Sequence, residues 1–91
     1  MKTVEELNEY LSEHGFEDTA FFVKPYFIEA IVGMTEDGRL IYNYEKMIDA
    51  LMNEEEDFDE TDAIEWIDYN TIRTIPYMGP CAPAIMYPIE A

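Results

Sequence analysis

The stretch YFIEAIVGMTEDGRLIY, residues 26 to 42, decides the fold. Asp37-Gly38 lies between two apolar runs, and glycine accepts the positive φ that a tight hairpin turn requires. Residues 26–34 alternate in the manner of a strand, and residues 39–42 provide the returning strand. The stretch therefore predicts an antiparallel hairpin at the centre of the domain.

The chain ahead of the hairpin predicts a helix over residues 3–14. Thr3 and the glutamate three positions later have the spacing of a capping box, and Gly15 is placed to stop the helix in the left-handed conformation. Residues 19–23 are apolar and form either a short strand or an extended lead-in, because Pro25 breaks a ladder.

Two further helices are expected after the hairpin. Asn43 can cap a helix over residues 44–53. Residues 53–60 form an acidic linker, after which Thr61 or Asp62 starts the next helix. Asp62 and Glu65 have capping-box spacing, with aspartate in the Ser/Thr position.

The end of this third helix is ambiguous, because residues 71–75 also alternate as a strand does and Pro76 must terminate either structure. Prolines then punctuate the tail and leave only residues 84–87 free to form a short third strand at a sheet edge. The predicted class is α+β: a small antiparallel sheet of about three strands, in the order α-β-β-α-α-β, covered by helices in one domain of residues 1–91.

The charge limits the partners. The 91 residues carry 21 acidic and 5 basic side chains, a net charge of −16. Nucleic acids and anionic membranes are recognised through basic patches, so neither is an expected partner. A basic protein would be attracted.

Three features of the sequence indicate the cellular compartment. Cys81 is the single cysteine, so no intrachain disulfide can form, and a free thiol suits a reducing compartment. The first residues, MKTVEELNEYL, are acidic and lack the apolar segment of a signal peptide. No apolar run approaches the ~20 residues of a membrane span. We expect a cytoplasmic protein.

Catalysis is not expected. Ser12 and His14 lie two positions apart on a helix and do not share a face, and neither has an evident oxyanion partner. Cys81 could approach His14 in space, but the prolines that flank it indicate a rigid turn. Acid–base catalysis by paired carboxylates stays open in principle, but carboxylates are so abundant that the pattern selects no pair.

A metal or cofactor is not expected either. From Asp57 the spacing D-x-D-x-T partly imitates a calcium loop, yet the sixth position is Asp62 where glycine is needed, and the twelfth is Asp68 where glutamate is usual. One histidine and one cysteine cannot close a zinc site. There is no glycine-rich phosphate loop.

The acidic side chains concentrate on the first helix, the linker and the third helix. Helix N-termini explain some of this charge, because the helix dipole favours carboxylates there, but not the whole load. Either the remainder keeps the chain soluble, or it forms a surface for a basic partner. The expected partner-binding set is Glu5, Glu9, Glu13, Glu54, Glu55, Glu56, Asp57, Asp59, Glu60, Asp62, Glu65 and Asp68.

Carboxylates four residues apart on a helix lie ~5–6 Å from each other, a spacing comparable with that of phosphates along a nucleic-acid strand. In size, acidity and α/β pattern the chain resembles the small acidic inhibitors of bacteriophages and mobile elements, such as anti-CRISPR and anti-restriction DNA mimics. The segment AIEWIDYNTIRTIPYMGPCAPAIMYPI, residues 63–89, likewise resembles small bacterial or phage proteins. This resemblance implies an inhibitor that occupies the basic groove of a nucleic-acid-binding enzyme and transfers no individual residue role.

An assembly module is the alternative function. Seven tyrosines in a small domain supply amphipathic side chains of the kind enriched at protein interfaces, although packing accounts for most of them. In that case an edge strand over residues 84–87 would pair with a second copy in a homodimer.

Overall fold

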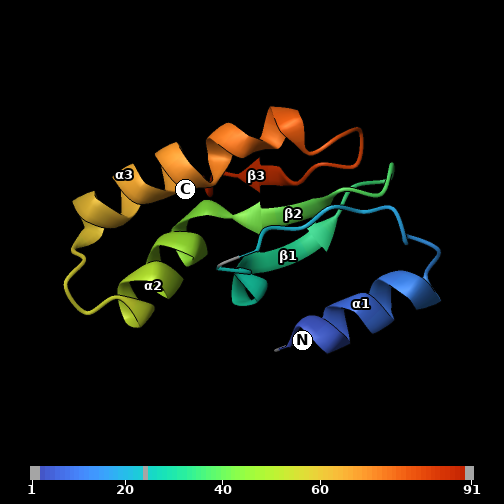
Figure 1. The fold of residues 1–91 in the computed structure, drawn as a ribbon, viewed down its shortest axis with the longest axis horizontal. Coiled ribbons are helices and arrows are strands. Elements are labelled where there is room, and N and C mark those ends of the chain that lie inside the picture. The colour runs from blue at the N-terminus through green and yellow to red at the C-terminus, as the bar shows by residue number, and fades with distance from the viewer. Residues whose placement is uncertain (1–2, 24, 90–91) are drawn as a thin grey trace.

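The computed structural model describes residues 3–23 and 25–89 (Figure 1). The predicted α+β class and element order are confirmed. The α-helices are α1 (Val4–Glu13), α2 (Tyr44–Glu54) and α3 (Glu60–Asn70). The strands are β1 (Ile31–Met34), β2 (Leu40–Asn43) and β3 (Ala84–Met86), and two 3₁₀ helices, η1 (Ile28–Ala30) and η2 (Ile72–Tyr77), complete the fold.

The first helix lies within its predicted range of residues 3–14, with Thr3 and His14 as its cap residues. The Glu6 amide donates to Thr3 Oγ1 at 3.1 Å, which satisfies one of the free amides of the first turn. Gly15 has φ +77°, and the Phe16 amide donates to the Leu11 carbonyl at 2.7 Å. This left-handed ending turns the chain away from α1 and toward the sheet.

The hairpin turn is confirmed, with Gly38 at φ +87°. The Thr35 amide donates to the Arg39 carbonyl at 2.7 Å, and the Gly38 amide donates to the Thr35 carbonyl at 3.1 Å. Because positive φ is unfavourable for residues that have a side chain, the glycine fixes the position of the turn and hence the pairing of Met34 with Leu40. Farther from the turn, the register shifts between Ile31 and Gly33.

The first strand is shorter than predicted. The alternating pattern indicated a strand over residues 26–34, but β1 begins at Ile31. Phe27 has φ +53°, and the chain then makes the single 3₁₀ turn of η1. Phe27 and Ala30 are both buried, and residues three apart share a side of a 3₁₀ turn but lie on opposite faces of a strand. Burial of this pair therefore favours the turn.

The third strand forms as predicted, but the sheet is mixed and not antiparallel. β1 and β2 pair antiparallel, whereas β2 and β3 pair in parallel, with Tyr42 opposite Ile85. A crossover through α2, α3 and η2 separates the parallel strands and returns the chain to the end of the sheet where β2 starts (Figure 1). Arg39 secures this return: its Nε donates to the Ala82 carbonyl at 2.7 Å and its Nη2 to the Pro83 carbonyl at 3.3 Å.

The cap of the second helix is confirmed, and that of the third is displaced from its predicted position. Asn43 Oδ1 accepts from the Lys46 amide, so α2 starts at Tyr44. The capping box of α3 is Asp59 with Asp62, and not Asp62 with Glu65. The α-helix stops at Asn70, ahead of the 3₁₀ helix η2 that holds Pro76, so residues 72–75 form neither strand nor α-helix.

The core lies between the sheet and the helices. All three helices contribute apolar side chains to it, and the segment between α1 and η1 adds Phe22. The Phe22 amide donates to the hydroxyl of buried Tyr42 at 3.3 Å. The buried apolar cluster comprises Leu7, Leu11, Phe22, Phe27, Ala30, Leu40, Tyr42, Met47, Ile48, Leu51, Ala63 and Ile67.

Candidate protein-binding site

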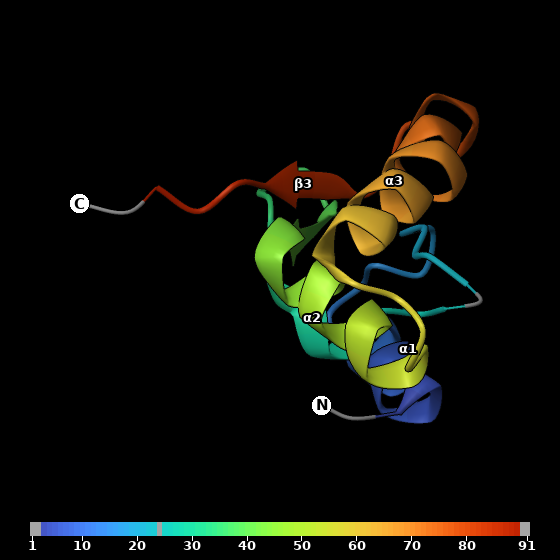
Figure 2. The same cartoon turned by 90° about the vertical axis from the view of Figure 1, so that its left-hand side faces the viewer.

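The predicted partner-binding carboxylates are all exposed, but they do not form one surface. Glu5, Glu9 and Glu13 belong to α1, which lies at the opposite end of the structure from α3 (Figures 1 and 2). The other predicted carboxylates belong to the end of α2, the connector and α3. The structure thus separates the α1 carboxylates from those of α3.

Three of the predicted carboxylates have contacts within the fold. Asp59 Oδ1 accepts from the Asp62 amide at 2.9 Å, and Asp62 Oδ2 accepts from the Asp59 amide at 3.4 Å. Asp68 accepts from the Tyr44 hydroxyl at 2.9 Å. Helix capping and a link between α2 and α3 therefore account for part of the acidity without any partner.

A groove between α2 and the start of α3 gathers other carboxylates. Glu45, Asp49 and Glu60 line it together with Ile48 and Met52, around a volume of about 240 Å³. The lining residues that the structure describes include neither lysine nor arginine. We call this the α2–α3 groove. Its apolar side chains can contact an aliphatic stem while its carboxylates meet a positive head group, which is the division of polarity within Lys and Arg side chains.

A second groove lies beside the connector. Glu54, Glu55, Phe58 and Trp66 line it, with Leu51 and Pro25. Phe58 and Trp66 are half-buried and pack against the core cluster, so Phe58 anchors the connector to the fold. Glu54 and Glu55 thus extend the negative surface along the end of α2.

The link between Tyr44 and Asp68 also involves the tail. The Tyr44 ring lies 4.8 Å from the Tyr87 ring, centroid to centroid. Burial, followed by the hydrogen bond to Asp68 and its negative charge, raises the pKa of Tyr44 to about 12. Tyr44 therefore stays protonated and donates to Asp68 throughout the neutral range.

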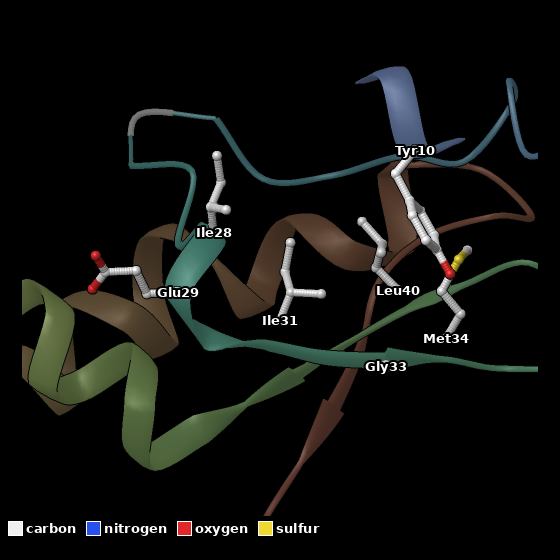
Figure 3. Close-up of a pocket in the computed structure, with 7 residues that line it drawn as sticks. All are labelled: Tyr10, Ile28, Glu29, Ile31, Gly33, Met34 and Leu40. Carbon is white, nitrogen blue, oxygen red and sulfur yellow. The ribbon is translucent and has the colours of Figure 1, made fainter. Parts of the chain in front are cut away.

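An apolar pocket opens between α1, η1 and the β1–β2 hairpin (Figure 3). Its volume is about 270 Å³. The Tyr10 ring extends from α1 toward the hairpin, and the two isoleucines and Leu40 point into the space between helix and strand, whereas Glu29 lies at the opposite end from Tyr10 (Figure 3). The lining residues are Tyr10, Ile28, Glu29, Ile31, Gly33, Met34 and Leu40.

The side chains considered for catalysis occupy structural positions. His14 is the C-cap residue of α1, and its ring lies 4.2 Å from the Tyr10 ring, centroid to centroid. Cys81 is half-buried in the loop before β3, where its carbonyl accepts from the Ala20 amide at 3.1 Å.

Neither a metal site nor a membrane span is found among the described residues. The segment from Asp57 to Asp68 cannot adopt a calcium loop in this fold, because α3 already begins at Glu60. In residues 3–23 and 25–89, no three His, Cys, Asp or Glu side chains gather closely enough to hold a metal ion. Within the same ranges, no helix has both the length and the apolarity needed to cross a bilayer.

Sequence reasoning missed Glu45 and Asp49. Their spacing of four residues on a predicted helix places them on one face, and this pattern could have identified them. Their approach to Glu60, by contrast, depends on how α2 and α3 pack. The lining of the apolar pocket comes from four elements and has no comparable pattern in the sequence.

Comparison with known proteins supplies no relative. No protein-family model matches the chain, and no curated protein or solved structure matches it either. The functional assignment therefore depends on the chemistry of these grooves.

Proposed function

We propose that this protein is a non-catalytic binding module that recognises a basic protein through the α2–α3 groove. The observation that carries the proposal is that Glu45, Asp49 and Glu60 line one groove together with Ile48 and Met52. A lysine or arginine of a partner would place its aliphatic stem on the apolar side chains and its positive group among the carboxylates. The net charge of −16 would accelerate the encounter through long-range attraction.

Inhibition of a nucleic-acid-binding enzyme is a narrower form of this function. Mimicry of an extended phosphate row would need many carboxylates on one surface, and the distance of α1 from α3 disfavours it. A basic segment seated in one groove needs only the side chains gathered there. We therefore infer a groove-directed interaction, in which the α1 carboxylates have no direct part.

The test compares two variants that remove the same charge. The groove variant carries Glu45→Gln, Asp49→Asn and Glu60→Gln, and the matched control carries Glu5→Gln, Glu9→Gln and Glu13→Gln on α1. Each removes three negative charges from exposed positions. Their binding to a fluorescein-labelled peptide of alternating lysine and leucine is measured by anisotropy at low and high salt.

The groove variant is expected to lose roughly tenfold in affinity, since three exposed ion pairs contribute ~0.2–1 kcal/mol each. The control variant should bind nearly as the wild type does, and salt should weaken wild-type binding. Equal losses in both variants would mean that only the overall charge attracts the peptide, and the groove proposal would then fail. Capture of a basic host protein by the wild type and the control, but not by the groove variant, would identify a natural partner.

Self-association through β3 is the second candidate function. β3 has no strand neighbour on its outer side among the described residues, and the chain beyond it extends away from the body (Figure 2). Tyr87 and Ile89 are exposed there, the latter at 95%. Light scattering over a range of concentrations tests this candidate: a mass that stays monomeric at the highest concentration excludes it.

A further inference from the structure

Gly33 lies in β1 at an irregularity of the strand pairing, because the register of β1 on β2 shifts between Ile31 and Gly33. Its φ does not lie in the left-handed region, and a Cβ built on it would meet nothing within 4 Å. By contrast, Gly38 has φ +87°, and its Cβ would lie 3.2 Å from the Phe16 ring. A glycine inside a strand weakens the strand and often marks a bulge or a place where a ligand or another backbone approaches closely. The bulge accounts for the irregular pairing, and the open space beside Gly33 leaves room for such an approach.

The open space at Gly33 belongs to the apolar pocket. Gly33 lies on β1 between Ile31 and Met34, which line the same pocket (Figure 3). β1 is the outermost strand, with only β2 beside it among the described residues. The pocket therefore adjoins a strand edge and leaves the backbone at Gly33 accessible from the pocket side.

The geometry points to an extended polypeptide segment as the occupant. We propose that a segment of a partner protein lies along β1 over Gly33, inserts an apolar side chain between Ile28, Ile31 and Leu40, and presents a Lys or Arg to Glu29. The volume of about 270 Å³ suits one or two apolar side chains and lies below the ~300–1,000 Å³ that is usual for small-molecule sites.

Charge selects the kind of segment. Among the described residues that line the pocket, Glu29 is the one charged residue; it is exposed at one end of the apolar row, and its carboxylate points away from the apolar side chains (Figure 3). A second copy of the chain would bring another net charge of −16, whereas a basic segment is attracted by both Glu29 and the whole protein. The inference rests on the proposed function in one respect, namely that the partner is a basic protein.

The experiment is selection from a displayed library of random dodecapeptides on the wild-type protein, with counter-selection on Gly33→Val. The counter-selection matters because a highly acidic protein retains any basic peptide, and Gly33→Val has the same charge as the wild type. Val32→Ile is the matched control: Val32 neighbours Gly33 on β1, is 45% exposed and does not line the pocket. Gly33→Ala should melt no lower than the wild type, which checks that the site tolerates a side chain.

The expected peptides combine alternate apolar residues with a lysine or arginine. Their affinity should fall by about tenfold or more on Gly33→Val, because the new side chain occupies the space that the peptide needs, and should be unchanged on Val32→Ile. Peptides selected on Glu29→Gln in place of the wild type should no longer be enriched in lysine or arginine.

Two results would overturn the inference. One is that no peptide is enriched beyond the counter-selection, or that the enriched peptides bind Gly33→Val as tightly as the wild type. The other is a wild-type dimer that Gly33→Val dissociates, which would make a second copy the occupant. The groove variant distinguishes the two proposals. Selected peptides that bind the groove variant but do not bind Gly33→Val support the pocket, even if the α2–α3 groove binds nothing.

Discussion

Replacement of Tyr42 by phenylalanine should alter both the stability of the protein and the response of that stability to pH. The Tyr42 side chain is 0% exposed, and its hydroxyl accepts from the amide of Phe22, which is 4% exposed. Tyr42→Phe leaves that buried amide without its partner, at a cost of about 1–3 kcal/mol. We expect the free energy of unfolding at pH 8 to fall by that amount.

At alkaline pH, by contrast, the ionisation of Tyr42 lowers the stability of the wild type. Burial raises the pKa of Tyr42 from 10 to about 12, and the hydrogen bond from Phe22 opposes this only in part. Between these two values the folded state keeps the proton that the unfolded state has released, so unfolding releases a proton and is favoured by rising pH. The Tyr42 contribution is therefore complete below pH 10 and falls by about 1.4 kcal/mol per pH unit up to pH 12.

The two effects together predict that the wild-type advantage over Tyr42→Phe shrinks with pH. Over the two units the wild type loses about 2–3 kcal/mol that the variant cannot lose, so the two proteins should approach equal stability near pH 12. Urea unfolding followed by circular dichroism at several pH values, with reductant and constant salt, measures the difference.

Tyr77→Phe is the matched control, because Tyr77 is 89% exposed, and it should change stability by less than about 0.5 kcal/mol. A stability difference between wild type and Tyr42→Phe that stays constant from pH 8 to pH 11.5 would refute the reasoning.

Three other substitutions test the local structure. Asp59→Ala should lower the stability by about 0.5–2 kcal/mol in urea unfolding because α3 loses its N-cap, and Asp59→Asn should recover most of the loss. Gly38→Ala should cost about 1–2 kcal/mol or more, since alanine disfavours the turn conformation and its methyl group crowds Phe16; an unchanged melting temperature would contradict this. Asp68→Asn should lower the pKa of Tyr44 from about 12 toward 10 by removing a negative charge, which ultraviolet absorbance titration measures, and no change would leave burial as the sole cause.

The predicted partner-binding set and the lining of the proposed α2–α3 groove share one residue, Glu60. The carboxylates at residues 54–60 were expected at a binding surface, and Glu60 does line the α2–α3 groove. Glu45 and Asp49 lie outside the run of highest charge density, and only the helical face that they share distinguishes them in the sequence. The expectation of one surface that included α1 also went beyond the sequence, because periodicity gives the exposed face of each helix but not how two helices are placed relative to each other.

The amino-acid sequence by itself determined the features that depend on neighbouring residues. Thr3 and Asn43 start helices, and Gly15 and Gly38 adopt positive φ, because a cap or a turn involves atoms only a few residues apart. Composition likewise fixed the net charge of −16.

Tertiary structure alone decided the rest. The parallel pairing of β3 depends on the crossover through α2 and α3, and the 3₁₀ turn at η1 depends on burial of Phe27 and Ala30 against other elements. The α2–α3 groove and the pocket at Gly33 each combine residues from separate elements. Contacts between distant segments are set by how the apolar surfaces of whole elements fit together, and a local pattern of residues carries no information about that fit.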